Sequence, residues 1–265
     1  MYNIGIDIGG TFTKAGLVEG TRILYKTQIQ TPKNMNSENF FELTTHLIET
    51  ILAYNNLTIA NIKAIGIGIA GMVLADKGAL VSAGNLGLSN LDIATPIQKQ
   101  YGVPVKIAND VACFALAQSK ISKIDNLVYI TIGTGINAGV INKGKLFSGA
   151  HGASIEYGHT FLMATADKCA CGRGGCIEQF INAKKVQENN DFLPHLTTVL
   201  LNIINTFRPE EIFIGGGGAQ FITPFLDDLD RELARNHYGY KNAQPVRVEI
   251  SKISTEGGII GATLL

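Results

Sequence analysis

Residues 2–29 read YNIGIDIGGTFTKAGLVEGTRILYKTQI, and this stretch decides the fold class. An alternating, then apolar run begins at Tyr2 and ends in a glycine turn, after which residues 14–18 and 21–29 resume strand patterns. Short apolar and β-branched runs bounded by glycine are typical of strands joined by tight turns. The stretch therefore predicts three successive strands, the first two joined by a glycine hairpin.

The same pattern recurs over residues 127–147. An apolar run is followed by Gly133, Thr134 and Gly135, and the next strand reads AGVI at 138–141, close to AGLV at 15–18. We infer an internal duplication, with an N-terminal lobe over residues 1–118 and a C-terminal lobe over 119–255. A small-residue helix expected over 256–265 would pack back on the first lobe and complete it.

Each glycine hairpin has two interpretations. Only glycine lets a backbone approach phosphate oxygens closely, so two such hairpins facing one cleft would offer N–H groups and hydroxyls to a nucleotide. Either hairpin alone could equally be a simple β-turn. The repetition favours phosphate binding.

Between the hairpins, strands and helices alternate. We expect a helix over Glu38–Tyr54, strands over 62–70 and 103–108, and a helix over 111–118, a pattern that implies parallel strands with helices on the sheet faces. Asp110 follows a strand's carboxyl end, where ligands of open α/β sheets bind, and is a catalytic candidate. Asn and Asp are also favoured helix N-caps, and position alone does not decide.

A single loop gathers most of the cysteines. Residues 156–178 read EYGHTFLMATADKCACGRGGCIE, which places one histidine and three of the four cysteines together, namely His159, Cys169, Cys171 and Cys176. Three thiolates and an imidazole complete a tetrahedral Zn²⁺ shell with no position open for water, which indicates a structural metal. The cysteines could instead form a disulfide with one spare, or remain unligated thiols. Cys113 lies apart, in an apolar run, and is expected in the core.

Later in the chain, a glycine run, Gly215, Gly216, Gly217 and Gly218, separates an expected strand over 211–214 from an amphipathic helix expected over 221–235. Such a run leaves room beside the sheet for a base or ribose, or it is only a loose connection.

Composition limits the classes of partner. Hydrophobic residues make up 46% of the chain and charged residues 17%, with zero net charge and a pI near 7.0. These values predict a well-packed core and no electrostatic attraction to nucleic acid or membrane. The opening MYNIGID does not resemble a targeting segment, so we expect a cytoplasmic protein with a small, specific ligand.

Taken together, these motifs resemble the ROK family of repressors and sugar kinases, which has the two-lobed actin-like ATPase (ribonuclease H-like) fold with a nucleotide cleft between its lobes. The resemblance covers nearly the full length in family order and is carried by DIGGTFTK from Asp7, AGNL ending at Leu86, AND at 108–110, IGTGINAG from Ile132, EYGH, CACGRGGCIE, IGGGG from Ile214 and EGGIIGA. It implies an ATP-dependent carbohydrate kinase acting on a hexose or N-acylhexosamine.

The resemblance also implies roles for individual residues. Asp110 matches the general base, and Asp7 matches the acid that orients Mg²⁺. The phosphate contacts would be Gly9, Gly10, Thr11, Lys14, Gly133, Thr134 and Gly135, and the adenosine turn would be Gly215–Gly218. The sugar contacts would be Asn85, Asn109, Asp110, Glu156, His159 and Glu178, with His159 serving zinc through one ring nitrogen and the sugar through the other.

Several departures from the family pattern concern the substrate and the assembly. Ala108, Ala112 and Ile155 stand where the family commonly has Glu, Asn and Gly. Only a short polar piece is expected between Glu178 and a helix at 196–207, where relatives carry helices that commonly pair subunits, so a homodimer is not assumed. A regulator or scaffold that binds sugar without catalysis is the alternative. DNA-binding relatives carry a helix-turn-helix before the first strand, which is expected here from residue 2, so we expect no nucleic acid partner.

Overall fold

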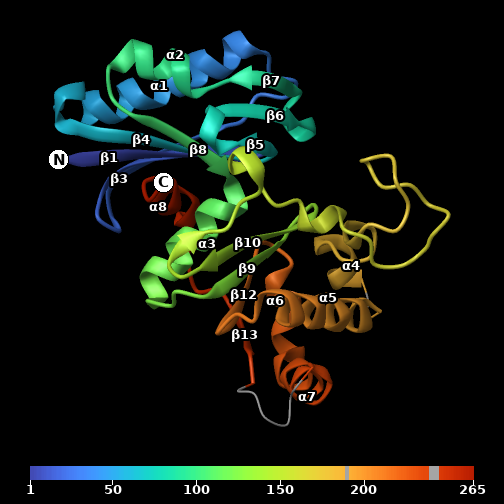
Figure 1. The fold of residues 1–265 in the computed structure, drawn as a ribbon. Helices are drawn as coiled ribbons and strands as arrows, with labels where there is room; N and C mark the ends of the chain where they lie inside the picture. Colours follow the sequence, from blue (N-terminus) through green and yellow to red (C-terminus); the bar gives the residue numbers. More distant parts are fainter. Residues whose placement is uncertain (189–190, 239–244) are drawn as a thin grey trace. The chain divides into compact units, whose positions relative to one another are not determined.

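A computed structural model describes residues 1–188, 191–238 and 245–265 of the chain (Figure 1). The chain divides into two compact units. Unit 1 comprises Met1–Ser122, Ser148–Ile155 and Ile253–Leu265, and unit 2 comprises Lys123–Phe147 and Glu156–Lys252. The Ser148–Ile155 segment joins unit 1 partly through Ser154, whose backbone N–H donates to the Val73 carbonyl at 3.0 Å.

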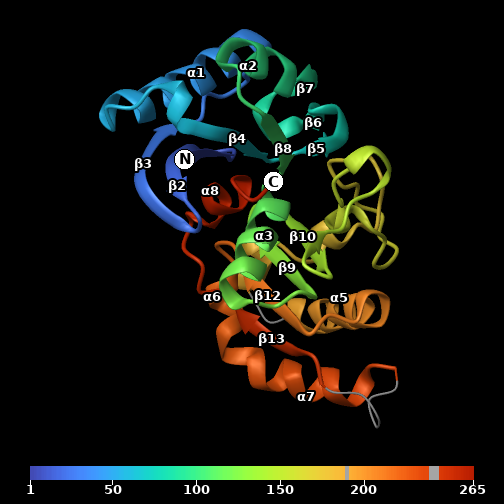
Figure 2. The same cartoon turned by 60° about the vertical axis from the view of Figure 1, so that its left-hand side comes forward.

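Unit 1 is built on a five-stranded sheet in the order β3-β2-β1-β4-β8, which comprises Arg22–Gln30, Phe12–Glu19, Tyr2–Ile8, Ile62–Ile69 and Val105–Asn109. The first three strands are antiparallel neighbours, and β1, β4 and β8 run parallel. The isoleucines of β1 and β4 are buried because helices cover both faces of the sheet (Figure 2). One face carries α1 (Ser37–Tyr54) and α2 (Ala94–Tyr101), and the other carries α3 (Asp110–Ser122) and α8 (Gly257–Ala262).

The C-terminal helix α8 packs on unit 1, as the sequence predicted. Its backbone lies directly on β1 and β4, where a Cβ atom at Gly5 or Gly66 would overlap the carbonyls of Ile259 and Ala262. Cys113 of α3 is fully buried, and a Cβ atom at Gly261 would overlap its carbonyl. Glycines on both sides therefore allow this close approach.

A second, three-stranded sheet in unit 1 was not predicted. It contains β5 (Met72–Leu74), β6 (Ala79–Ala83) and β7 (Leu88–Asp92) in antiparallel order. The strands are short and are joined by single turns of 3₁₀ helix, so they contain too few residues to show a clear alternation. One of these turns, residues 84–86, carries Asn85.

Unit 2 repeats the topology of unit 1. Its sheet has the order β11-β10-β9-β12-β13, which comprises Lys145–Leu146, Ile136–Asn142, Leu127–Ile132, Glu211–Gly215 and Arg247–Ile250. Again the first three strands are antiparallel neighbours. β12 runs parallel to β9, and β13 runs parallel to β12. The hairpins also correspond, since Ile8 pairs with Thr13 and Ile132 pairs with Ile136 at their bases. The predicted duplication is confirmed.

The helices of unit 2 are α4 (Ala183–Glu188), α5 (Phe192–Phe207), α6 (Ala219–Ile222) and α7 (Leu226–Asn236). The single helix predicted over 221–235 is wrong, because Pro224 lies in a 3₁₀ turn that separates α6 from α7. The piece expected to be short and polar after Glu178 contains α4, and its residues 189–190 lie outside the described part. In the described ranges, no helix combines the length and apolar character that a membrane span requires.

Candidate active site

The first glycine hairpin follows Asp7, which lies near the end of β1 opposite Lys14 of β2. The Asp7 side chain is buried, and its environment is unfavourable for a charge. Burial, together with the negative charge of Asp110, raises the pKa of Asp7 to about 7, although Lys14 acts in the opposite direction. A Cβ atom at Gly258 would lie 2.5 Å from the Asp7 carboxyl carbon, so α8 closes one side of this acid.

Asn109 and Asp110 form the junction between β8 and α3. The Asn109 Oδ1 accepts the Val111 N–H at 2.9 Å, and its Nδ2 donates to the Gly71 carbonyl at 3.0 Å. Asp110 Oδ1 accepts the same Val111 N–H at 3.0 Å. Both side chains therefore cap α3, as the alternative interpretation required, and Asp110 is the half-buried member that also acts electrostatically on Asp7.

Two further predicted residues of unit 1 differ in their surroundings. Asn85 lies beside the hairpin, because its Cβ is 3.8 Å from the position that a Cβ atom would take at Gly10. Lys14, predicted to bind phosphate, donates from Nζ to the Thr255 carbonyl at 3.2 Å. The neighbouring Lys26 forms an ion pair with Glu256, so two lysines hold the segment that precedes α8.

The second hairpin, Gly133–Gly135, lies in unit 2 beside Glu178. A Cβ atom at Gly135 would overlap Glu178 Oε2, so this glycine makes room for the carboxylate. The hairpin base aligns with that of unit 1, and the residue that corresponds to Asp7 by register is Thr131. The duplication has therefore kept the turn but carries the buried acid only in the first copy.

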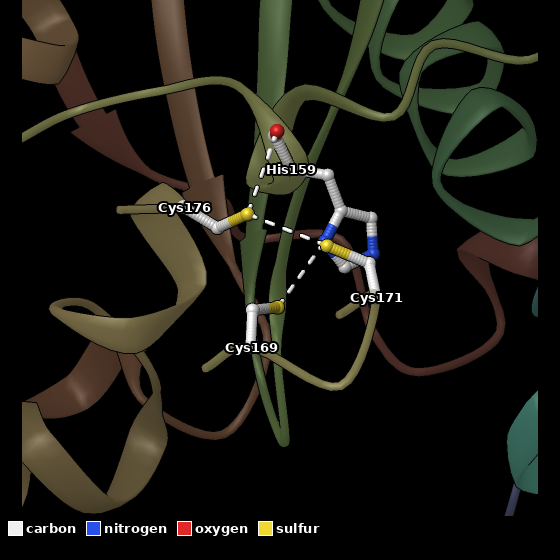
Figure 3. A group of neighbouring side chains, drawn as sticks. All are labelled: His159, Cys169, Cys171 and Cys176. Carbon is white, nitrogen blue, oxygen red and sulfur yellow. Dashed lines mark hydrogen bonds between the residues drawn. The ribbon is translucent and has the colours of Figure 1, made fainter. Parts of the chain in front are cut away.

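The four predicted metal ligands converge (Figure 3). Their ligand atoms, from His159, Cys169, Cys171 and Cys176, all lie within 4.8 Å of one another. Zn–S bonds of about 2.3 Å and Zn–N bonds of about 2.0 Å at tetrahedral angles place two sulfurs about 3.8 Å apart and a sulfur about 3.5 Å from the nitrogen. The Cys171 and Cys176 sulfurs are 3.5 Å apart, and the Cys169 sulfur is 3.6 Å from His159 Nδ1.

The chemistry of the cluster also suits a metal. All four cysteines of the chain are free, which excludes the disulfide interpretation in this structure. Hydrogen bonds from Arg173 lower the pKa of the exposed Cys171 thiol to about 6, which favours the thiolate that a metal binds. Burial raises the pKa of Cys169 and raises that of Cys176 to about 12, so a bound metal would displace protons from these two thiols. His159 turns Nδ1 toward the cysteines, so Nε2 is the nitrogen available for a second contact.

Two residues that position the segment from Glu156 to His159 were not predicted to do so. Asn137 in β10 accepts the Tyr157 N–H at 2.8 Å through Oδ1, which fixes the segment from Glu156 to His159. A Cβ atom at Gly158 would overlap the Ile136 carbonyl, so this segment lies directly on β10. A polar Asn inside an apolar strand, where Asn is disfavoured, was the available signal.

The glycine run that follows β12 is tightly built against β9. A Cβ atom at Gly215 would overlap the Tyr129 hydroxyl, Gly216 has a φ of +84°, and the Gly218 N–H donates to the Ile132 carbonyl at 2.8 Å. Gly217 is different, since nothing lies within 4 Å of its Cβ position and its φ is unstrained. The run is therefore an ordered turn with one open glycine, not a loose connection.

Each unit thus contains one set of predicted site residues. Unit 1 holds Asp7, Gly9, Gly10, Thr11, Lys14, Asn85, Asn109 and Asp110, and unit 2 holds Gly133, Thr134, Gly135, Glu156, Glu178, Gly215–Gly218 and the Cys3His cluster. Two copies of one sheet topology, each with a glycine hairpin at the first turn, define an α/β protein of the actin-like ATPase fold class.

The chain belongs to the ROK family, whose profile matches residues 3–191. It is 25% identical to a xylose repressor from Caldicellulosiruptor bescii, in an alignment that covers 97% of this chain and 76% of the repressor. It is 24% identical to a glucokinase from Halalkalibacterium halodurans, over 98% of this chain and 93% of that protein. In fold it is similar to a ROK family glucokinase from Streptomyces griseus solved with glucose and AMPPNP, with a TM-score of 0.80, 22% identity and coverage of 99% and 98%.

Proposed function

We propose that this protein is an ATP-dependent sugar kinase that transfers the γ-phosphate of ATP to a hydroxyl of a hexose or N-acylhexosamine. Curated relatives named glucokinase and N-acetyl-D-glucosamine kinase align with 98% of the chain, which supports this class of reaction. The assignment of individual residues rests on their surroundings within each unit.

The observation that carries the proposal concerns three glycines. Among the described glycines, only Gly84, Gly133 and Gly217 have both an unstrained φ and no atom within 4 Å of their Cβ position. The protein itself therefore gives no steric or conformational reason for glycine at these sites. All three lie in elements predicted to bind ligand: beside Asn85, in the second hairpin and in the adenosine turn. Close approach of a ligand to the backbone explains them.

Phosphoryl transfer needs a base and a place for magnesium. Asp110 would accept the proton of the sugar hydroxyl as that oxygen attacks the γ-phosphorus and ADP leaves with the bridging oxygen. Asp7 would hold Mg²⁺ through its carboxylate, and the bound ion would neutralise charge on the phosphates. The electrostatic effect of Asp110 on the pKa of Asp7 indicates that the two acids are close enough to cooperate.

The sugar side would be formed by amides, carboxylates and one imidazole, because each buried hydroxyl needs a donor and an acceptor. Asn85, Glu156, His159 and Glu178 supply these groups. Zn²⁺ fits the Cys3His cluster and would hold His159 by Nδ1, which orients Nε2 for a sugar hydroxyl. Each polar atom of the Asn109 side chain has one partner, which leaves one N–H and one lone pair for a sugar hydroxyl.

The test is sugar-dependent release of ADP. The purified protein is incubated with MgATP and, one at a time, hexoses and N-acylhexosamines. The proposal predicts ADP formation above the sugar-free rate with at least one sugar. No sugar-dependent ADP with any member of the panel would overturn it.

A second candidate, a sugar-binding regulator or scaffold, is favoured by the match to the xylose repressor and by the Ala108, Ala112 and Ile155 departures. Calorimetry with each sugar in the absence of ATP separates the two. Heat of sugar binding without any sugar-dependent ADP would support the regulator, whereas both signals with one sugar would support the kinase.

A further inference from the structure

Within unit 2, one segment contacts the loop of the Cys3His cluster, the second hairpin and the glycine turn. We define Cys176–Glu188 as the bracing segment; it contains a 3₁₀ turn at residues 177–179 and the helix α4. Its first residue, Cys176, supplies one of the four ligand atoms of the Cys3His cluster. Its later residues reach the second hairpin and the glycine turn.

At the metal end, Gln179 joins the bracing segment to the cluster loop. Its Oε1 accepts the N–H groups of Gly175 at 2.7 Å and Cys176 at 3.0 Å. Its Nε2 donates to the Asp167 carbonyl at 2.9 Å. One amide side chain therefore closes the loop around the metal ligands, although it is not a ligand itself.

In its middle, the bracing segment supports the second hairpin. The Ala183 N–H donates to the Gly133 carbonyl at 2.8 Å, and the Glu178 carboxylate occupies the space beside Gly135. Asn182 Nδ2 donates to the Glu178 carbonyl at 3.1 Å, and this bond fixes the chain between the two residues that contact the hairpin, Glu178 and Ala183. Ile181 is fully buried between them.

At its far end, the bracing segment reaches the adenosine turn. Val186 of α4 is buried, and its Cγ2 lies 3.1 Å from the Cβ position of Gly218. The helix α4 also contacts α6, which begins directly after the glycine run. The hairpin and the glycine turn thus share one support, and that support starts at a metal ligand.

We infer that metal binding at the Cys3His cluster sets the affinity of this protein for nucleotide, through the bracing segment, in addition to any effect on sugar. The inference rests on the proposed function. A bound metal uses its binding free energy to order the ligands and the chain that follows them. Without it, backbone hydrogen bonds still hold the chain on both sides of Cys176, from the Leu162 N–H to the Gly175 carbonyl at 2.7 Å and from the Ile177 N–H to the Thr160 carbonyl at 3.0 Å. The link from Cys176 to the other three ligands is lost, however, and the support of both nucleotide elements loosens.

The experiment measures binding of MgADP by calorimetry in the absence of sugar. Zn²⁺-loaded protein is compared with protein stripped by chelation and dialysed, and circular dichroism of the same samples reports the fold. We expect stripping to weaken MgADP binding at least tenfold while helix content is retained. Stripped, folded protein that binds MgADP as tightly as loaded protein would overturn the inference.

The variant Gln179→Ala keeps all four ligands and every contact with the hairpin, so it tests the same link if stripping unfolds the chain. It should need more Zn²⁺ than the natural protein, and its MgADP affinity should rise with Zn²⁺ occupancy. The matched control Gln187→Ala changes an exposed glutamine of α4 and should show neither effect. MgADP affinity of Gln179→Ala that is independent of Zn²⁺ would contradict the inference. If the loaded natural protein binds no MgADP, the proposed function fails instead.

Discussion

Replacing Asp7 by Asn should stabilise the protein at alkaline pH while it abolishes turnover. The folded chain raises the pKa of Asp7 from 3.8 to about 7, mainly by burial. The folded state therefore keeps a proton that the unfolded state releases between these values, and stability falls as pH rises through this window. A difference of about three pKa units, at about 1.4 kcal/mol each, corresponds to about 4 kcal/mol of lost stability above pH 7.

The assay is chemical unfolding followed by circular dichroism, without added magnesium, at several pH values. The unfolding free energy of Asp7→Asn minus that of the natural protein should increase by about 1.4 kcal/mol for each pH unit between about pH 5 and pH 7. The total of about 4 kcal/mol is an upper limit, because the amide brings N–H donors that also need acceptors. Asp227→Asn, an exposed acid on α7, is the control and should show little change with pH. If the difference in unfolding free energy between Asp7→Asn and the natural protein does not change with pH, the reasoning is refuted.

The remaining predictions concern glycines and the metal. Gly217→Ala should raise the KM for ATP and Gly84→Ala the KM for sugar, each without a change in thermal stability; each serves as the other's control, and a stability loss in either would show a structural role instead. Gly258→Ala should destabilise the protein by about 1–3 kcal/mol, because the added Cβ would overlap Asp7. Gly→Ala within a helix otherwise stabilises by about 1 kcal/mol, so unfolding measurements that show a stabilised variant would contradict the overlap. Cys176→Ser should reduce bound zinc from about one ion per chain to none in metal analysis, and full retention would contradict the tetrahedral site.

Much of the fold could be predicted because its signals are local. The hairpins at Gly9 and Gly133 and the shared strand pattern after them indicated the duplication, which the two identical sheet orders confirm. The β5–β7 sheet was missed because its strands have three to five residues and no long periodicity. The amphipathic pattern over residues 221–235 predicts one continuous helix, but Pro224 lies in a 3₁₀ turn that divides it.

The site was predictable to the extent that it depends on residue type and spacing. Three cysteines and a histidine in one loop sufficed to predict that they would converge. The environment of Asp7 could not be predicted, because its closest packing comes from Gly258 at the other end of the sequence. The polar Asn137 within an apolar strand is a signal that the sequence carries, but its partner, the Tyr157 N–H, belongs to another segment and could not be identified from the sequence.

The most direct measurement of the central claim is ADP release by Asp110→Asn beside the natural protein, at saturating MgATP and the best sugar of the panel, with sugar binding measured by calorimetry on both. The account predicts that the variant binds sugar with nearly unchanged affinity and that its sugar-dependent turnover falls by at least about 100-fold, the usual contribution of a general base. Because an Asn side chain also caps a helix, loss of the cap does not explain such a fall. Turnover close to that of the natural protein would show that Asp110 is only a helix cap.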